Sequence, residues 1–215
     1  MHPLATQALP CIVALVLAAL GFFVLHSQPG NKIHRWFAGH TFLLIVWTMA
    51  IAGVHGKSHL EFWGRLTFAA TSLILPTFLI FCRYFPSSLP WLHPGLVRLM
   101  AGTGIAFATV AMSSPLIAYD FSTSTGELTR KAGPLYPAFA AFMVAWSSIA
   151  IACALKKWRE ARGRARTQSQ FLGTRVILFG SLAITTNLLL PFFTAKRHPR
   201  RGLVHMSLAE AYGWP

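Results

Sequence analysis

Charged residues are scarce in this chain of 215 residues. Only 11% of the residues carry a charge, and no more than five are acidic, whereas about 25% of the residues of an average soluble domain are charged. So little charge cannot cover the surface of a soluble globule of this size. Cysteine is scarce too, since Cys11, Cys82 and Cys153 are too few and too scattered for a disulfide framework or a metal knuckle. These shortages exclude a soluble domain and a disulfide-stabilised one.

Acidic residues are also missing from the middle of every long apolar run. They lie between the runs, in a basic connection or in the tail: Glu61, Asp120, Glu127, Glu160 and Glu210. Ionisable groups inside the bilayer usually mark ion or proton pathways, so their absence argues against a pump. We also find no phosphate-binding glycine loop, nucleophile elbow, paired carboxylates or zinc spacing. We therefore expect no enzymatic activity and no cofactor.

Long apolar runs are what the sequence contains instead. Hydrophobic residues make up 54% of the chain, and they gather in six runs at about residues 8–26, 36–54, 62–82, 96–118, 135–155 and 176–194. A helix of about 20 apolar residues crosses the hydrocarbon core of a bilayer. The runs therefore predict an all-α fold, a polytopic membrane helix bundle with about six transmembrane helices.

The distribution of Lys and Arg predicts the orientation of these helices. Positive residues concentrate in the first, third and fifth connections, and the fifth alone, residues 156–175, holds seven: Lys156, Lys157, Arg159, Arg162, Arg164, Arg166 and Arg175. Connections rich in Lys and Arg stay in the cytoplasm, which places the N-terminus outside. The net charge of +14 is thus a topology signal, and the fifth connection could also attract anionic lipid headgroups. We expect no nucleic-acid partner.

Prolines inside or beside the runs predict kinks. They are Pro76, Pro115, Pro137 and Pro191, and hydroxyl and amide side chains lie near them: Thr71, Thr77, Ser113, Ser114, Thr185, Thr186 and Asn187. A proline within a helix frees a carbonyl group that such side chains can satisfy. Two interpretations remain open, namely kinked-helix packing and a kink that lines a small ligand cavity.

Histidine is plentiful, with nine residues, but only His40 lies well inside an apolar run. A bis-histidine haem needs two facing histidines at matching depth, and His40 has no such partner in the sequence. We therefore expect His40 to be hydrogen-bonded within the bundle. A haem-bearing redox membrane protein and a small membrane transporter remain the alternatives.

The basic cluster after the sixth run conflicts with the predicted topology. Six helices and an outside N-terminus place the C-terminus outside, yet the sixth run is followed at once by Lys196, Arg197, Arg200 and Arg201. No seventh apolar run follows. We interpret residues 8–194 as a transmembrane helical sensor-type domain and residues 195–215 as a basic tail, truncated or disordered.

Several short motifs carry a family resemblance over about residues 8–194. The segments are "NKIHRWFAGHTFLLIVWTMA", "FWGRLTFAATSLILPTFLIFCRYFP", "GPLYPAFAAF" and "RTQSQFLGTRVILFGSLAITTNLLLPFF", and the matching positions are Asn31, Arg35, Trp47, Trp63, Arg65, Pro76, Asn187 and Pro191. Together they resemble the N-terminal seven-helix membrane region of bacterial histidine kinases, here without the seventh helix.

The resemblance implies a sensory or membrane-anchoring input module in the inner (plasma) membrane. Its partners would be the lipid bilayer and a cytoplasmic transmitter or a membrane partner protein. No phospho-acceptor or ATP-binding segment is present, so kinase activity does not carry over. The resemblance makes the eight matching positions candidates for binding a small or lipophilic ligand, and Asn187 and Pro191 are the foremost of them.

Overall fold

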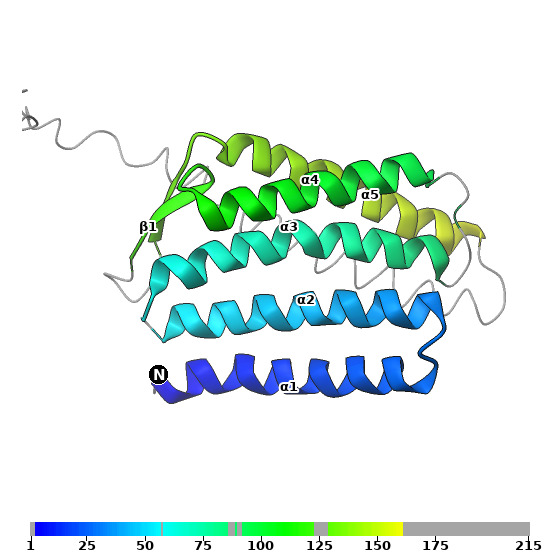
Figure 1. Ribbon diagram of the computed structural model, residues 1–215, viewed down its shortest axis with the longest axis horizontal. Coiled ribbons are helices and arrows are strands. Elements are labelled where there is room, and N and C mark those ends of the chain that lie inside the picture. Colours follow the sequence, from blue (N-terminus) through cyan, green and yellow to red (C-terminus); the bar gives the residue numbers. More distant parts are fainter. Residues whose placement is uncertain (1–2, 57, 86–88, 90–91, 123–128, 161–215) are drawn as a thin grey trace, which may run out of the picture.

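The computed structural model describes residues 3–56, 58–85, 89, 92–122 and 129–160. In order, these residues form α1 (Pro3–Ser27), α2 (Lys32–His55), α3 (Leu60–Tyr84), α4 (Pro94–Ser113), β1 (Ala118–Ser122), β2 (Thr129–Ala132) and α5 (Tyr136–Glu160). The helices lie side by side (Figure 1), and all five are long and apolar enough to cross a membrane. This confirms a mostly helical, polytopic bundle. The predicted sixth helix, residues 176–194, and the basic tail, residues 195–215, fall outside the described residues.

Local side-chain chemistry sets several helix ends. The Asn31 side chain accepts a hydrogen bond from the N–H of Ile33 at 2.9 Å and so satisfies one of the N–H groups that a helix start leaves unpaired. His93 does the same for the N–H of Gly95 at the start of α4. At its other end α4 stops at Ser113, before the predicted end at residue 118, because Pro115 has no N–H and disfavours helical backbone just before it.

The middle of the bundle is α3, which contacts α2, α4, α5 and β1. In contrast, α1 contacts α2 at the edge of the bundle (Figure 1). Its apolar side chains are largely uncovered, with exposed fractions of 70% for Leu15 and 71% for Phe22. Such a surface is unfavourable in water and favourable against lipid tails, so α1 is a lipid-facing helix.

Rings from three helices meet in what we call the aromatic cluster: Phe68 of α3, Phe107 of α4, and Phe139, Phe142 and Trp146 of α5. The ring centroids are 5.4 Å apart for Phe68 and Phe139, and 4.8 Å apart for Phe107 and Phe142. Such aromatic pairs contribute about 0.5–1.5 kcal/mol each beyond the area they bury. The aromatic cluster therefore joins the N-terminal half of α5 to α3 and α4.

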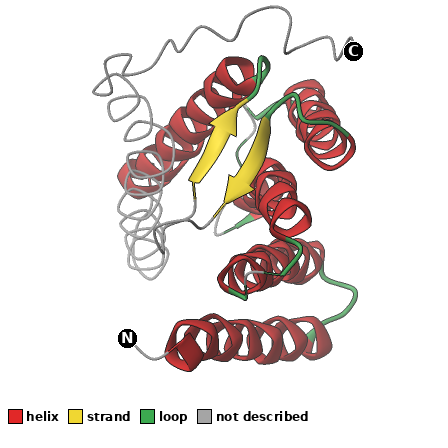
Figure 2. Cartoon of the chain, turned by 90° about the vertical axis from the view of Figure 1, so that its left-hand side faces the viewer, coloured by secondary structure: helices red, strands yellow, loops and turns green. Residues whose placement is uncertain are grey.

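A β-hairpin crosses one end of the bundle (Figure 2). The sequence analysis treats this stretch as a polar connection, and two strands of five and four residues are too short for a clear alternating pattern. The strands pair antiparallel, with Tyr119 opposite Lys131. Because the predicted topology places this end of the bundle outside the cell, we call it the outer end and the opposite one the inner end.

An exposed ion pair links the two strands of the hairpin. The Lys131 ammonium lies 2.7 Å from the Asp120 carboxylate, and the hydrogen bond that it donates there raises the pKa of Lys131 above its usual value of 10.5. The contribution of the charged lysine is therefore fully present at neutral pH and is lost as the pH rises through that raised pKa. Because both side chains are well exposed, the pair is a minor source of stability.

Glycine and arginine determine how the hairpin sits on the outer end of the helices. A Cβ atom at Gly64 of α3 would lie 2.5 Å from the Phe121 ring, so only glycine lets this ring approach α3 so closely. The Arg130 guanidinium carbon is 4.8 Å from the centre of the Phe68 ring, a cation–π distance. The hairpin is thus packed on α3 through two side chains that face the helix.

Phe121→Leu is expected to loosen the hairpin and to lower the free energy of unfolding by about 1 kcal/mol. The branched side chain cannot replace the close contact of the buried ring with Gly64. Limited proteolysis from the outer side, with cleavage sites mapped by mass spectrometry, measures the loosening. Tyr119→Leu, at an exposed ring on the same strand, is the control. Equal cleavage of the two variants would contradict the packing role of Phe121.

The last helix that the structure describes runs further than the apolar run predicts. The predicted end is residue 155, but α5 continues to Glu160. Lys156, Lys157 and Arg159, counted in the fifth connection, therefore lie in the last turns of α5, and Lys157 is only 2% exposed. A partner on another helix, described below, explains how a lysine is accommodated there.

Candidate functional site

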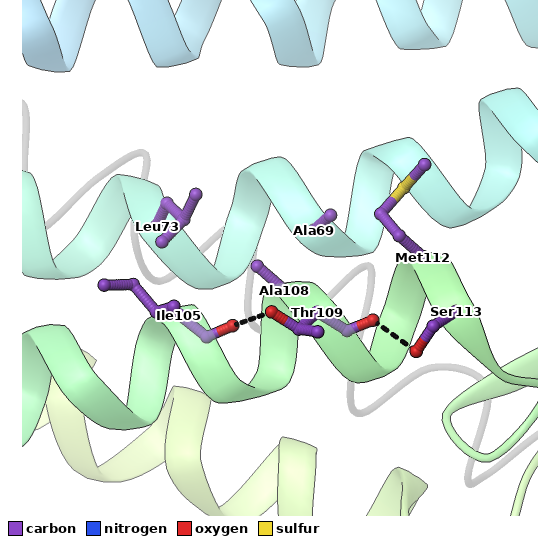
Figure 3. A pocket seen from close by; sticks show the side chains of 7 residues that line it. All are labelled: Ala69, Leu73, Ile105, Ala108, Thr109, Met112 and Ser113. Carbon is purple, nitrogen blue, oxygen red and sulfur yellow. Dashed lines mark hydrogen bonds between the residues drawn. The ribbon is translucent and has the colours of Figure 1, made fainter.

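A shallow, open groove lies between α3 and α4. Its volume is about 700 Å³, and it is lined by Ala69, Leu73, Ile105, Ala108, Thr109, Met112 and Ser113 (Figure 3). The two hydroxyl groups donate to carbonyls of their own helix, Thr109 to Ile105 at 3.0 Å and Ser113 to Thr109 at 2.8 Å. The surface of the groove is therefore mostly carbon, which suits an apolar ligand.

At Pro76, α4 packs closely against α3. Pro76 lacks the N–H that would bond to the carbonyl of Ser72, and Gly104 of α4 lies against this position. A Cβ at Gly104 would be 2.7 Å from the Ser72 oxygen and 2.9 Å from the Pro76 ring. For this proline, the expectation that a hydroxyl satisfies the freed carbonyl is wrong, because the nearby hydroxyls donate to other carbonyls of α3. Thr71 donates to Thr67, and Ser72 donates to Ala69. Thr77 donates to Leu73 and Ile74.

His40 is hydrogen-bonded inside the bundle, as predicted. Its Nδ1 lies 3.3 Å from the Thr77 hydroxyl oxygen, and its ring is 5.5 Å from that of Phe78. The Thr77 hydroxyl also lies within hydrogen-bond distance of the carbonyls of Leu73 and Ile74 on its own helix. In the described part of the chain, no group of three or more His, Cys, Asp or Glu side chains is placed to hold a metal ion.

Arg65 holds the outer end of α4. Arg65, one of the eight matching positions, lies near the start of α3. It donates from Nη1 to the carbonyl of Met112 at 3.3 Å and from Nη2 to Glu61 at 2.6 Å. The Met112 carbonyl belongs to the last turn of α4, where helix carbonyls lack partners of their own. Arg65 thus links the start of α3 to the end of α4.

Lys157 makes the matching link at the inner end. Its ammonium group donates to the backbone carbonyls of Cys82 and Phe85, at the end of α3. Sequence reasoning missed this contact, yet a signal was present. Ala150, Cys153, Ala154 and Lys157 recur at helical spacing, and all four are buried, so the buried face of α5 runs on to the lysine.

Six of the candidate ligand positions lie in the described part of the chain, and none of them lines the groove. Asn31 caps α2, Arg35 is exposed at the inner end, and Trp47 is half-buried. Trp63 lies against Gly53, where a Cβ would be 2.2 Å from the indole ring. These residues, Arg65 and Pro76 serve helix ends and helix contacts. Asn187 and Pro191 lie outside the described residues.

The comparisons with known proteins give one match. Residues 9–199 match a family model described as the N-terminal 7TM region of histidine kinase. No curated protein and no solved structure matches the chain. The family match extends over all five described helices and over the predicted sixth run.

Proposed function

The chain belongs to the family of N-terminal seven-transmembrane regions of histidine kinases, and from this membership we propose that it detects a small or lipophilic molecule within its helix bundle. The match over residues 9–199 carries the proposal, since it covers the helices of a sensory input region. The module acts without catalysis of its own, in the inner (plasma) membrane, and a cytoplasmic transmitter or a membrane partner reads its state.

A ligand can act on such a bundle only by binding one packing arrangement more tightly than another. The groove between α3 and α4 supports a lipophilic ligand, because its lining is mostly carbon and it opens between two membrane-spanning helices. The family positions Asn187 and Pro191, with the neighbouring Thr186, are the second candidate contact surface. In the sequence these positions combine a proline with polar side chains inside an apolar run.

Saturating substitution of Thr186, Asn187 and Pro191 tests this proposal. The chain is fused to a histidine-kinase transmitter, and autophosphorylation in membranes is the readout, with insertion checked by size-exclusion chromatography. We expect several properly inserted variants to shift the basal signal, because they change the relative stability of two bundle states. Unchanged signalling in every inserted variant would sink the assignment of the ligand site to these positions.

Ala108→Phe is expected to fill the groove and to alter the basal signal of the same fusion by about fivefold or more, which corresponds to a coupling energy of about 1 kcal/mol. Ala106→Phe, on the same helix at an exposed position that does not line the groove, is the control and should leave the signal unchanged. Equal signals from the two variants would remove the groove from the proposal.

A further inference from the structure

Lys157 is a buried cation that joins two helices far apart in the sequence. Only 2% of its surface is exposed, and its Nζ donates to the carbonyl oxygens of Cys82 and Phe85. Cys82 lies in the last turn of α3, and Phe85 is the first residue after the helix. Carbonyls at a helix C-terminus lack intrahelical partners and form the negative end of the helix dipole. The ammonium group of α5 therefore caps α3.

The neighbouring carbonyls at the end of α3 have other partners. The N–H of Phe85 donates to Phe81, and the N–H of Leu89 donates to Arg83, both at 3.1 Å. Lys157 donates to two carbonyls that these backbone hydrogen bonds do not use. The end of α3 thus depends on a side chain from α5 to complete its hydrogen bonds.

The packing of α5 is uneven along its length. In its outer half, Phe139 contacts Phe68 of α3 and Phe142 contacts Phe107 of α4, and Trp146 packs against Phe142. In its inner half the buried side chains before Lys157 are small: Ser147, Ala150, Cys153 and Ala154. Small side chains bury little area and contribute little packing energy. Lys157 is therefore the largest buried side chain in the inner half of α5, where Ile149 packs against the core as a partly buried side chain.

A lysine at this place has two favourable positions. A buried ammonium group is costly unless it is hydrogen-bonded, and the carbonyls of α3 supply those bonds. A lysine near the end of a membrane helix can also extend its flexible stem to the interface and be hydrated. Positions in between leave the charge without partners, so the contact is either made or broken.

We propose that Lys157 is a clasp between α5 and α3, and that its release moves the inner end of α5 and so changes what the cytoplasmic side receives. The geometry makes α5 a lever that the aromatic cluster holds at the outer half and Lys157 holds at the inner end. The packing role of the clasp stands whether or not the bundle binds a ligand. Its regulatory role rests on the proposed input function.

Two native cysteines report on the clasp. The carbonyl that Lys157 bonds belongs to Cys82 itself, Cys153 lies one turn before Lys157, and the exposed fractions are 1% and 0%. In the purified full chain in lipid vesicles, we expect Lys157→Met to raise the rate of maleimide labelling at both cysteines by about tenfold, because local opening exposes them. Cys11, on lipid-facing α1, should label at an unchanged rate.

Matched variants separate the clasp from general damage. Lys156→Met removes the neighbouring exposed lysine, which faces Glu160 at 3.7 Å, and it should leave the labelling of Cys82 and Cys153 unchanged. Lys157→Arg keeps the charge and the donors and should preserve most of the protection. If Lys157→Met does not insert, Lys157→Gln, which keeps a donor but loses the charge, is compared with Lys156→Gln.

Signalling by the transmitter fusion tests the regulatory half. Lys157→Met is expected to shift basal autophosphorylation by about threefold or more, as for other coupling residues, whereas Lys156→Met should not. Unchanged labelling in inserted Lys157→Met, or in Lys157→Gln where the methionine variant does not insert, overturns the clasp. Faster labelling with unchanged phosphorylation overturns only its regulatory role, and the variants at Thr186, Asn187 and Pro191 judge the ligand site separately.

Discussion

Gly104→Leu is expected to lower the free energy of unfolding by about 3 kcal/mol, the upper range for overpacking a closely packed interior. The new Cβ would lie 2.7 Å from the Ser72 carbonyl oxygen and 2.9 Å from the Pro76 ring. One neighbour is backbone and the other a rigid ring, so neither can rotate away. The substitution must push α4 from α3 at the kink. Unfolding of the chain by SDS titration from mild detergent measures the loss.

Gly102 is the matched control for this prediction. It lies in the same helix, but a Cβ there has no neighbour within 4 Å. Gly104→Ala and Gly102→Ala add the same helix propensity, so the difference between them isolates the contact with α3. We expect Gly104→Ala to destabilise the chain and Gly102→Ala to be neutral or slightly stabilising. Equal stability of the two alanine variants would refute a close contact at Gly104.

Gly53→Leu should cost a comparable amount, about 2–3 kcal/mol, at the contact between α2 and α3. A Cβ at Gly53 would lie 2.2–2.6 Å from three atoms of the Trp63 indole. This ring also packs edge-on against Phe62 at 5.1 Å, which limits the directions in which it can move. The same unfolding titration applies. Gly39→Leu, in α2 with open space around it, is the control.

A double-mutant cycle shows whether the Gly53 effect comes from the indole ring. Gly53→Ala should destabilise the chain with Trp63 in place and should be nearly harmless with Trp63→Ala, because the ring that it meets is then absent. Contacting residues show interaction energies of about 0.5–3 kcal/mol in such cycles. Additive effects of the two substitutions would contradict direct contact as the cause.

The membrane-spanning helices were predictable from the sequence because hydropathy over about 20 residues does not depend on what a segment packs against. All five described helices coincide with apolar runs. Their ends were less predictable. The amide of Asn31 begins α2 and Pro115 stops α4 early, both by local chemistry, whereas α5 runs past its apolar stretch because Lys157 has a partner on α3.

The candidate site shows where residue patterns stop being informative. The pairing of His40 within the bundle followed from its lone position in an apolar run, but its partner Thr77 was not identifiable. Pro76 suggested a kink with a hydroxyl partner, whereas in the structure Gly104 of α4 packs directly against this position. The groove between α3 and α4 has no sequence signature, because its lining comes from two helices whose relative rotation the sequence does not reveal.

By itself, the sequence determined that this protein is a membrane-embedded helix bundle. Its long apolar runs need contact with lipid, and it has too few charges to cover a surface in water. Its short motifs also pointed to the family that the match over residues 9–199 establishes. Only the tertiary structure decided that Arg65 and Lys157 cap helices other than their own, and that the hairpin packs on Gly64. These are contacts between residues distant in the chain, and their geometry exists only once the helices have packed.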